Sequence, residues 1–114
     1  MEGRQTLSEQ TPETPVLDLI TTMTAASLEA TTLDAEATML VRIAALVAVD
    51  APPASYVMNL GPAAELGIGE DEVRAVLAAI APIVGTTKVV SATGNILRAL
   101  GFILEMGELE AAED

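Results

Sequence analysis

Apolar residues recur at helical spacing along most of this chain. After Pro15, which suits a first helical turn, an apolar stripe extends to about Ala30. The members of that stripe are Val16, Leu17, Ile20, Met23 and Leu28. A second segment, with Asp34 as a candidate N-cap, is apolar nearly all round and stops before Pro52. The pattern predicts two helices here, and the second should be central and buried.

Three further helical segments follow, each bounded by glycine or proline. One opens at Pro52 or Pro53 and stops at Gly67, with a bend predicted at Gly61-Pro62. The next runs from Gly69 to Gly85, and Pro82 is expected to kink or end it. The last begins at Thr86 or Thr87, and a break at Gly101 would leave a short helix over 102–109. Strand signals are weak, so the prediction is an all-α fold, a compact multi-helix bundle of five to six helices.

The length and the charge distribution predict how the chain is organised. A chain of 114 residues makes one domain. We expect a flexible N-terminal arm at residues 1–14, a helical domain at 15–104 and an acidic C-terminal tail at 105–114. The net charge is −12, and the acidic ends surround a nearly neutral centre. No basic patch exists to neutralise phosphates, which disfavours nucleic-acid binding.

Composition favours self-association and a cytoplasmic location. Hydrophobic residues make up 51% of the chain, but the aromatic ones are only Tyr56 and Phe102. A short chain with thin apolar side chains gains by burying surface between subunits, so we expect a homo-oligomer. The first 15 residues are polar, and the longest uncharged apolar run, Ile43 to Val49, is too short to cross a bilayer. The expectation is a cytoplasmic protein with no membrane partner.

The chain contains no cysteine and no histidine. Thiol catalysis and disulfides are therefore excluded, and the commonest metal ligand is missing. The consecutive acids Glu70, Asp71 and Glu72 point in different directions on a helix, so they compensate the helix dipole and do not converge on a metal. We expect neither a metal nor a cofactor.

The order of motifs between Leu33 and Gly101 resembles one known family. Arg42-Ile-Ala-Ala-Leu-Val-Ala precedes a turn at Asp50-Ala-Pro-Pro, then Tyr56-Val-Met-Asn-Leu-Gly-Pro-Ala-Ala-Glu-Leu-Gly67, an acidic helix start and Gly85. Over about the last two thirds of the chain this resembles the carboxymuconolactone decarboxylase and alkylhydroperoxidase D-like family. The resemblance implies a small all-helical subunit, usually part of a trimer or hexamer.

The same resemblance implies a redox relay that this chain lacks. Spaced back from Gly67, the family's two thiol positions fall at Pro52 and Ser55, and its histidine position falls at Asn59. The position of its glutamate falls at Met39 or Leu40. The chain is therefore expected to be a divergent member without the relay, acting as an oligomeric binding or assembly protein and not as a Cys-dependent peroxidase.

Five polar residues remain near the position of the family's pocket. Tyr56 and Asn59 are the catalytic candidates, and Arg42, Ser55 and Asp50 are the candidates for binding a small carboxylate. The alternative function is a lyase or isomerase acting on a small oxygenated carboxylic acid or lactone. A purely structural reading also stands: Tyr56 fills the core and bonds a backbone carbonyl, Asn59 caps or bridges helices, and Arg42 neutralises an acid.

Overall fold

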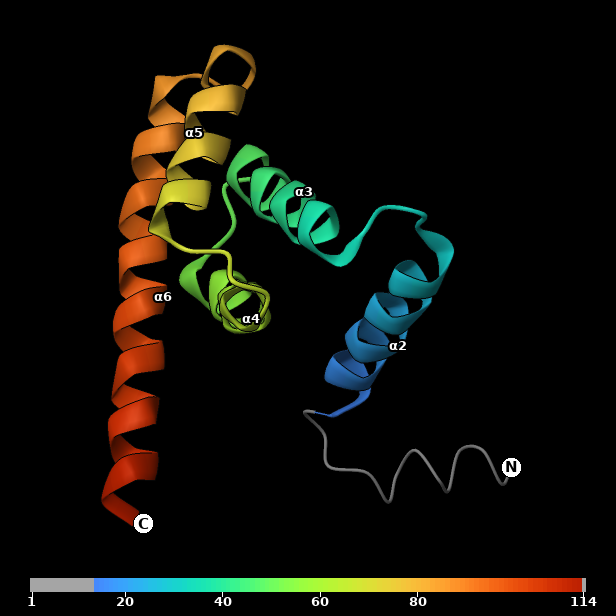
Figure 1. Cartoon of the computed structure of the whole chain (residues 1–114), viewed down its shortest axis with the longest axis vertical. Coiled ribbons are helices and arrows are strands. Elements are labelled where there is room, and N and C mark those ends of the chain that lie inside the picture. The colour runs from blue at the N-terminus through green and yellow to red at the C-terminus, as the bar shows by residue number, and fades with distance from the viewer. Residues whose placement is uncertain (1–13, 114) are drawn as a thin grey trace. The chain divides into compact units, whose positions relative to one another are not determined.

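The computed structural model describes residues 14–113, and side chains as far as residue 109. Five α-helices account for most of this part of the chain (Figure 1). They are α2 (Thr14–Ala30), α3 (Ala35–Ala48), α4 (Pro53–Glu65), α5 (Glu70–Val84) and α6 (Thr86–Glu113). No strand occurs among the described residues, so the all-α prediction is confirmed. The predicted arm, except for Thr14, lies outside them.

The chain divides into two units, residues 1–33 and 34–114. In the first unit the described structure is essentially α2, a 17-residue helix with no buried residue. The second unit contains α3 to α6 and holds the core. The range 15–104 thus includes α2 from the first unit and most of the second unit, whose last helix, α6, continues to Glu113 through residues predicted as an acidic tail.

The core of the second unit is built from small and medium-sized side chains. Three helices supply most of its fully buried residues, and α4 packs most extensively against α6. These residues are Met39, Ile43 and Val47 on α3, Tyr56, Leu60 and Ala63 on α4, and Ala92, Ile96 and Ala99 on α6. Helix α5 has no buried residue and covers this core with the half-buried side chains of Val73, Val76, Leu77 and Ile80. Helix α3 lies close to α4, α5 and α6, as its apolar pattern predicts.

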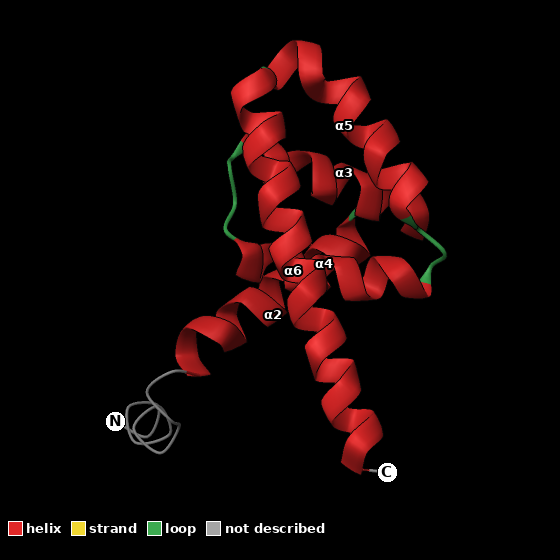
Figure 2. Cartoon of the chain, turned by 90° about the vertical axis from the view of Figure 1, so that its left-hand side faces the viewer, coloured by secondary structure: helices red, strands yellow, loops and turns green. Residues whose placement is uncertain are grey.

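Helix α6 differs from the prediction because it does not break at Gly101 (Figure 2). A glycine inside a helix costs only about 1 kcal/mol relative to alanine, and good helix formers surround this one. From Thr86 to Leu109, α6 is long and apolar enough to cross a membrane. The core helix of a soluble protein can have the same length and composition. Only 17% of its most apolar stretch is buried, so this helix leaves much of its apolar surface exposed.

Candidate functional site

The five predicted site residues lie on α3, in the turn after it and on α4. Arg42 is half-buried on α3. Asp50 is exposed in the turn and has a φ of 54°, a left-handed conformation that aspartate tolerates better than most residues. Ser55, Tyr56 and Asn59 occupy the first half of α4. The structure brings four of these residues together as two local pairs, Tyr56 with Asp50 and Asn59 with Ser55.

The first pair is Tyr56 and Asp50. Tyr56 is completely buried, and its hydroxyl has no hydrogen-bond partner among the described residues. The prediction that it fills the core is confirmed, whereas the predicted bond to a backbone carbonyl is wrong. Burial raises the pKa of Tyr56, and the negative charge of Asp50 raises that pKa further. A general base needs a pKa lowered toward neutrality, so this environment works against proton abstraction by Tyr56.

The second pair is Asn59 and Ser55. The side-chain amide of Asn59 donates to the backbone carbonyl of Ser55, one turn earlier in α4, at 2.8 Å. The predicted role of Asn59 as a cap or a bridge between helices is therefore wrong, because the bond stays within one helix. This bond uses one of the two N–H donors of the amide.

Three side chains of α6 form hydrogen bonds to the turn after α3, and the sequence pattern did not predict these contacts. Lys88 Nζ donates to the carbonyl of Ala48 at 2.8 Å, and Ser91 Oγ donates to Asp50 Oδ1 at 2.6 Å. Asn95 Nδ2 donates to the carbonyl of Ala51 at 3.2 Å. Residues 88, 91 and 95 share one face of a helix, and that spacing is the signal that could have revealed the contact. These bonds make Asp50 a structural residue of the turn.

The raised pKa of Tyr56 predicts a loss of stability in alkali. The ordinary pKa of tyrosine is 10.0, so Tyr56 in the unfolded chain loses its proton around that pH. In the folded chain its raised pKa keeps the proton in place to higher pH. The unfolded state then binds fewer protons, so the free energy of unfolding falls as the pH rises above about 10. Tyr56 is the chain's single tyrosine, so tyrosinate absorbance in the presence and absence of urea measures both pKa values directly. Tyr56→Phe should remove this part of the pH dependence; a titration at or below 10 in the folded protein would contradict the prediction.

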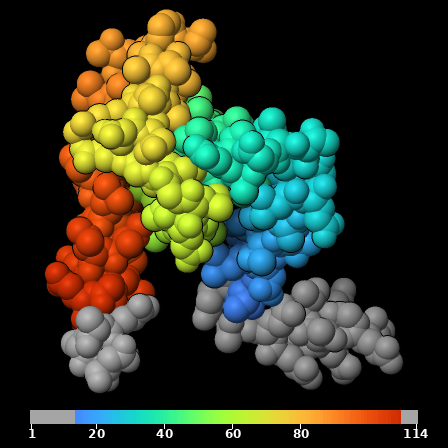
Figure 3. Space-filling view, in the orientation of Figure 1, coloured from blue at the N-terminus to red at the C-terminus, as the bar shows by residue number. Residues whose placement is uncertain are grey.

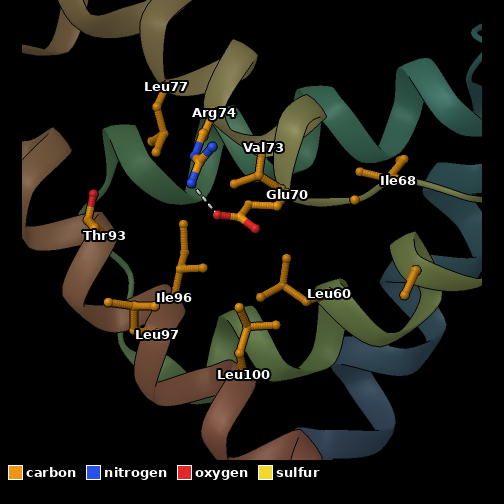
Figure 4. Close-up of a pocket in the computed structure, with 12 residues that line it drawn as sticks. Leu60, Ile68, Glu70, Val73, Arg74, Leu77, Thr93, Ile96, Leu97 and Leu100 are labelled. Atoms are coloured by element: carbon orange, nitrogen blue, oxygen red, sulfur yellow. Dashed lines mark hydrogen bonds and ion pairs between the residues drawn. The ribbon is translucent and has the colours of Figure 1, made fainter.

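A separate apolar cavity lies between α5, the end of α4 and α6 (Figure 4). Its volume is about 630 Å³. Leu60, Ile68, Val73, Leu77, Ile96, Leu97 and Leu100 are among its lining residues. Polar side chains at its edge are Glu70, Arg74 and Thr93. None of the five predicted site residues lines this cavity.

The polar groups of the cavity are already engaged. Arg74 forms an ion pair with Glu70 one turn earlier on α5, and both side chains are largely exposed. Thr93 Oγ donates to the carbonyl of Val89 at 2.9 Å. Among the described residues, no group of three or more acids could hold a metal ion. The cavity is therefore suited chemically to apolar contacts with a charged rim.

Comparisons with known proteins leave the family open. No protein-family profile, no curated protein and no solved structure matches this chain. The resemblance to the carboxymuconolactone decarboxylase family therefore remains a prediction that rests on the motif order between Leu33 and Gly101.

Proposed function

We propose that this chain is a self-associating helical protein that acts in binding or assembly. In this proposal it is a divergent relative of the carboxymuconolactone decarboxylase and alkylhydroperoxidase D-like proteins that lacks their redox relay. The observation that carries the proposal is the large apolar surface left uncovered on α2 and α6. The missing relay positions, Pro52, Ser55 and Asn59, support its non-redox character.

Helix α2 requires a covering surface. An isolated helix of this length is marginally stable in water, and most helical stability in proteins comes from packing an apolar face. Yet none of the 17 described residues of α2 is buried. Val16, Leu17, Leu19, Ile20, Met23 and Leu28 are all exposed. Burying this face against another chain would stabilise the helix, and this favours an oligomeric assembly.

Helix α6 supports the same conclusion independently. Its exposed large apolar side chains are Val90, Leu97, Leu100, Phe102, Leu104, Met106 and Leu109. Water-soluble monomers rarely expose a contiguous apolar surface of this extent, and such surfaces mark sites of association. The net charge of −12 keeps the remaining surface solvated.

The alternative is a lyase or isomerase acting on a small oxygenated carboxylic acid or lactone. The cavity is the feature that favours it, because about 630 Å³ lies within the range of small-molecule sites. Against it, Tyr56 has a raised pKa, and Tyr56 and Asn59 lie outside the lining of the cavity. Lactone turnover that disappears in a folded Tyr56→Phe, Asn59→Ala double variant would favour this alternative.

The mass in solution tests self-association. Sedimentation equilibrium should show a mass that is a multiple of the 11.7 kDa chain, and the family resemblance implies three or six copies. Dilution series should then measure the dissociation constant. A protein that stays monomeric at every concentration, in the absence of any added partner, would contradict the proposal.

A further inference from the structure

One exposed stripe on α6 repeats every seven residues. Val90, Leu97 and Leu104 have exposed fractions of 65%, 64% and 68%. Thr93 and Leu100 lie between them at the intermediate position of the repeat, and both are exposed. Apolar residues at this spacing lie along one side of a helix, as they do in helices that pair with another helix. The stripe therefore has the geometry of a helix–helix contact, and no described helix of its own unit covers it.

The C-terminal part of α6 extends past the other helices of its unit. Ala99 is its last buried residue among those whose side chains are described, and beyond it only Ile103 is half-buried. The ribbon of α6 continues well beyond α4 in two perpendicular views (Figures 1 and 2). In the space-filling view, this end of α6, in red, forms a free surface of the unit (Figure 3).

The stripe continues directly into the apolar cavity. Leu97 and Leu100 belong to both, and Thr93 lies at the same edge. Leu97 and Leu100 lie opposite α5 across this space (Figure 4). A helix packed on the stripe would therefore also cover the mouth of the cavity.

The charges of α6 are divided between its two halves. Lys88 and Arg98 lie in the first half, which has no acid. Glu105 and Glu108 lie in the second half, which has no base. A second copy of α6 running in the opposite direction would place its acidic half beside the basic half of the first. A parallel copy would place like charges together, which is unfavourable.

We propose that two copies of this chain pair through α6 in antiparallel orientation, with the two-fold axis near Gly101. This inference rests on the proposed self-association and names its interface. In this register Leu97 faces Leu104 of the second copy, and Arg98 lies within one helical turn of Glu105 of that copy. Gly101 lies near the axis, has no side chain, and is surrounded by open space within its own chain, so the surface there is free to receive a second helix. Each projecting half then lies over the cavity of the other copy, and the contact is self-complementary, as a two-fold interface must be.

Charge exchange tests the pairing. Arg98→Glu alone brings two acids within one helical turn of each other twice per dimer, and Glu105→Arg alone does the same with two bases. Each single variant should raise the dissociation constant by roughly tenfold or more, and the Arg98→Glu, Glu105→Arg double variant should restore it. Glu65→Arg on α4 makes the same charge change as Glu105→Arg. It is the matched control and should leave the dissociation constant unchanged. Failure of the double variant to restore association would overturn the antiparallel register.

Cysteine cross-linking tests the contact itself, since the chain has no cysteine of its own. A mixture of Leu97→Cys and Leu104→Cys proteins should form the mixed disulfide dimer efficiently. The two positions cannot bridge within one chain, because seven residues of helix separate them by about 10 Å. Ile83→Cys, at a position that is 86% exposed on α5, is the control and should not cross-link with Leu97→Cys.

The outcomes separate this inference from the proposed function. An oligomer in which Leu97→Cys and Leu104→Cys do not cross-link overturns the α6 interface and leaves self-association standing. A monomer at all concentrations overturns both. Binding of the wild-type protein to neutral phosphatidylcholine vesicles, without any pairing in water, would assign α6 to a membrane and overturn the inference. Binding of an apolar dye in the cavity of a fully paired dimer would also overturn it, because paired copies cover that space.

Discussion

Replacing Tyr56 with alanine should lower the free energy of unfolding by about 3–5 kcal/mol, as expected when a large, fully buried ring is removed. Tyr56 is among the largest completely buried side chains of the second unit, and the surrounding core is made of small and medium-sized side chains. Helices α3, α4 and α6 all supply buried residues around it, so few neighbours are large enough to fill the space. Urea unfolding followed by circular dichroism measures the change.

Tyr56→Phe is the matched control for that experiment. It keeps the ring and removes the buried hydroxyl, which has no hydrogen-bond partner. Removing an unpaired buried polar group should leave stability unchanged or raise it by about 1 kcal/mol. If Tyr56→Phe destabilised the protein as much as Tyr56→Ala, the hydroxyl would have to be hydrogen-bonded in solution. The ring would then not be the main stabilising group.

Enlarging Ala99 should have the second largest effect, a loss of about 1–3 kcal/mol or more for Ala99→Leu. Ala99 is completely buried on α6, and the equally small Ala63 and Ala92 are buried on α4 and α6. Helices α4 and α6 form the most extensive helix pair of the unit, so added volume there must separate them. Thermal unfolding measures the loss.

The control for Ala99→Leu is Ala78→Leu. Ala78 is exposed on α5, where a larger apolar side chain meets solvent and no helix. This variant should stay within about 0.5 kcal/mol of the wild type. Equal losses at the two alanines would show that helix propensity, and not packing between α4 and α6, sets the cost.

The ends of the helices could be predicted from sequence because they depend on contacts between near neighbours. Asp34 accepts a hydrogen bond from the backbone N–H of Ala37 at 2.7 Å, as expected of an N-cap. Gly67 and Gly85 have φ values of 85° and 90°, which explains why glycine ends α4 and α5. Glu72 accepts a bond from the N–H of Gly69 at 2.8 Å, in agreement with its predicted place at the start of a helix.

The prolines and Gly101 show where local signals are insufficient. Helix α4 continues through Pro62, and α5 continues through Pro82 to Val84. Helix α6 continues through Gly101. In a helix interior glycine costs about 1 kcal/mol and proline about 3 kcal/mol relative to alanine, and packing or strong helix formers on both sides outweigh these penalties here. A single proline or glycine therefore predicts a locally weakened helix more reliably than it predicts the end of that helix.

The candidate site depended still more on tertiary structure. The sequence identified Tyr56, Asn59, Ser55, Asp50 and Arg42 as the remaining polar residues of the resembled pocket. The structure places Tyr56 in the core, ties Asn59 to its own helix and binds Asp50 to Ser91, which is 41 positions later. Such distant contacts leave almost no trace in a local pattern.

By itself, the sequence of this protein determined the helical class, most helix ends and the absence of thiol chemistry. Those properties follow from side-chain spacing, backbone preferences of single residues and composition, which act over a few residues at a time. Only the tertiary structure decided that Tyr56 is buried without a hydrogen-bond partner and that the cavity lies away from the polar candidates. It alone showed that the apolar stripe of α6, which repeats every seven residues, is exposed. The reason is that burial depends on which helix faces are covered by other helices, and that choice is made between segments far apart in the chain.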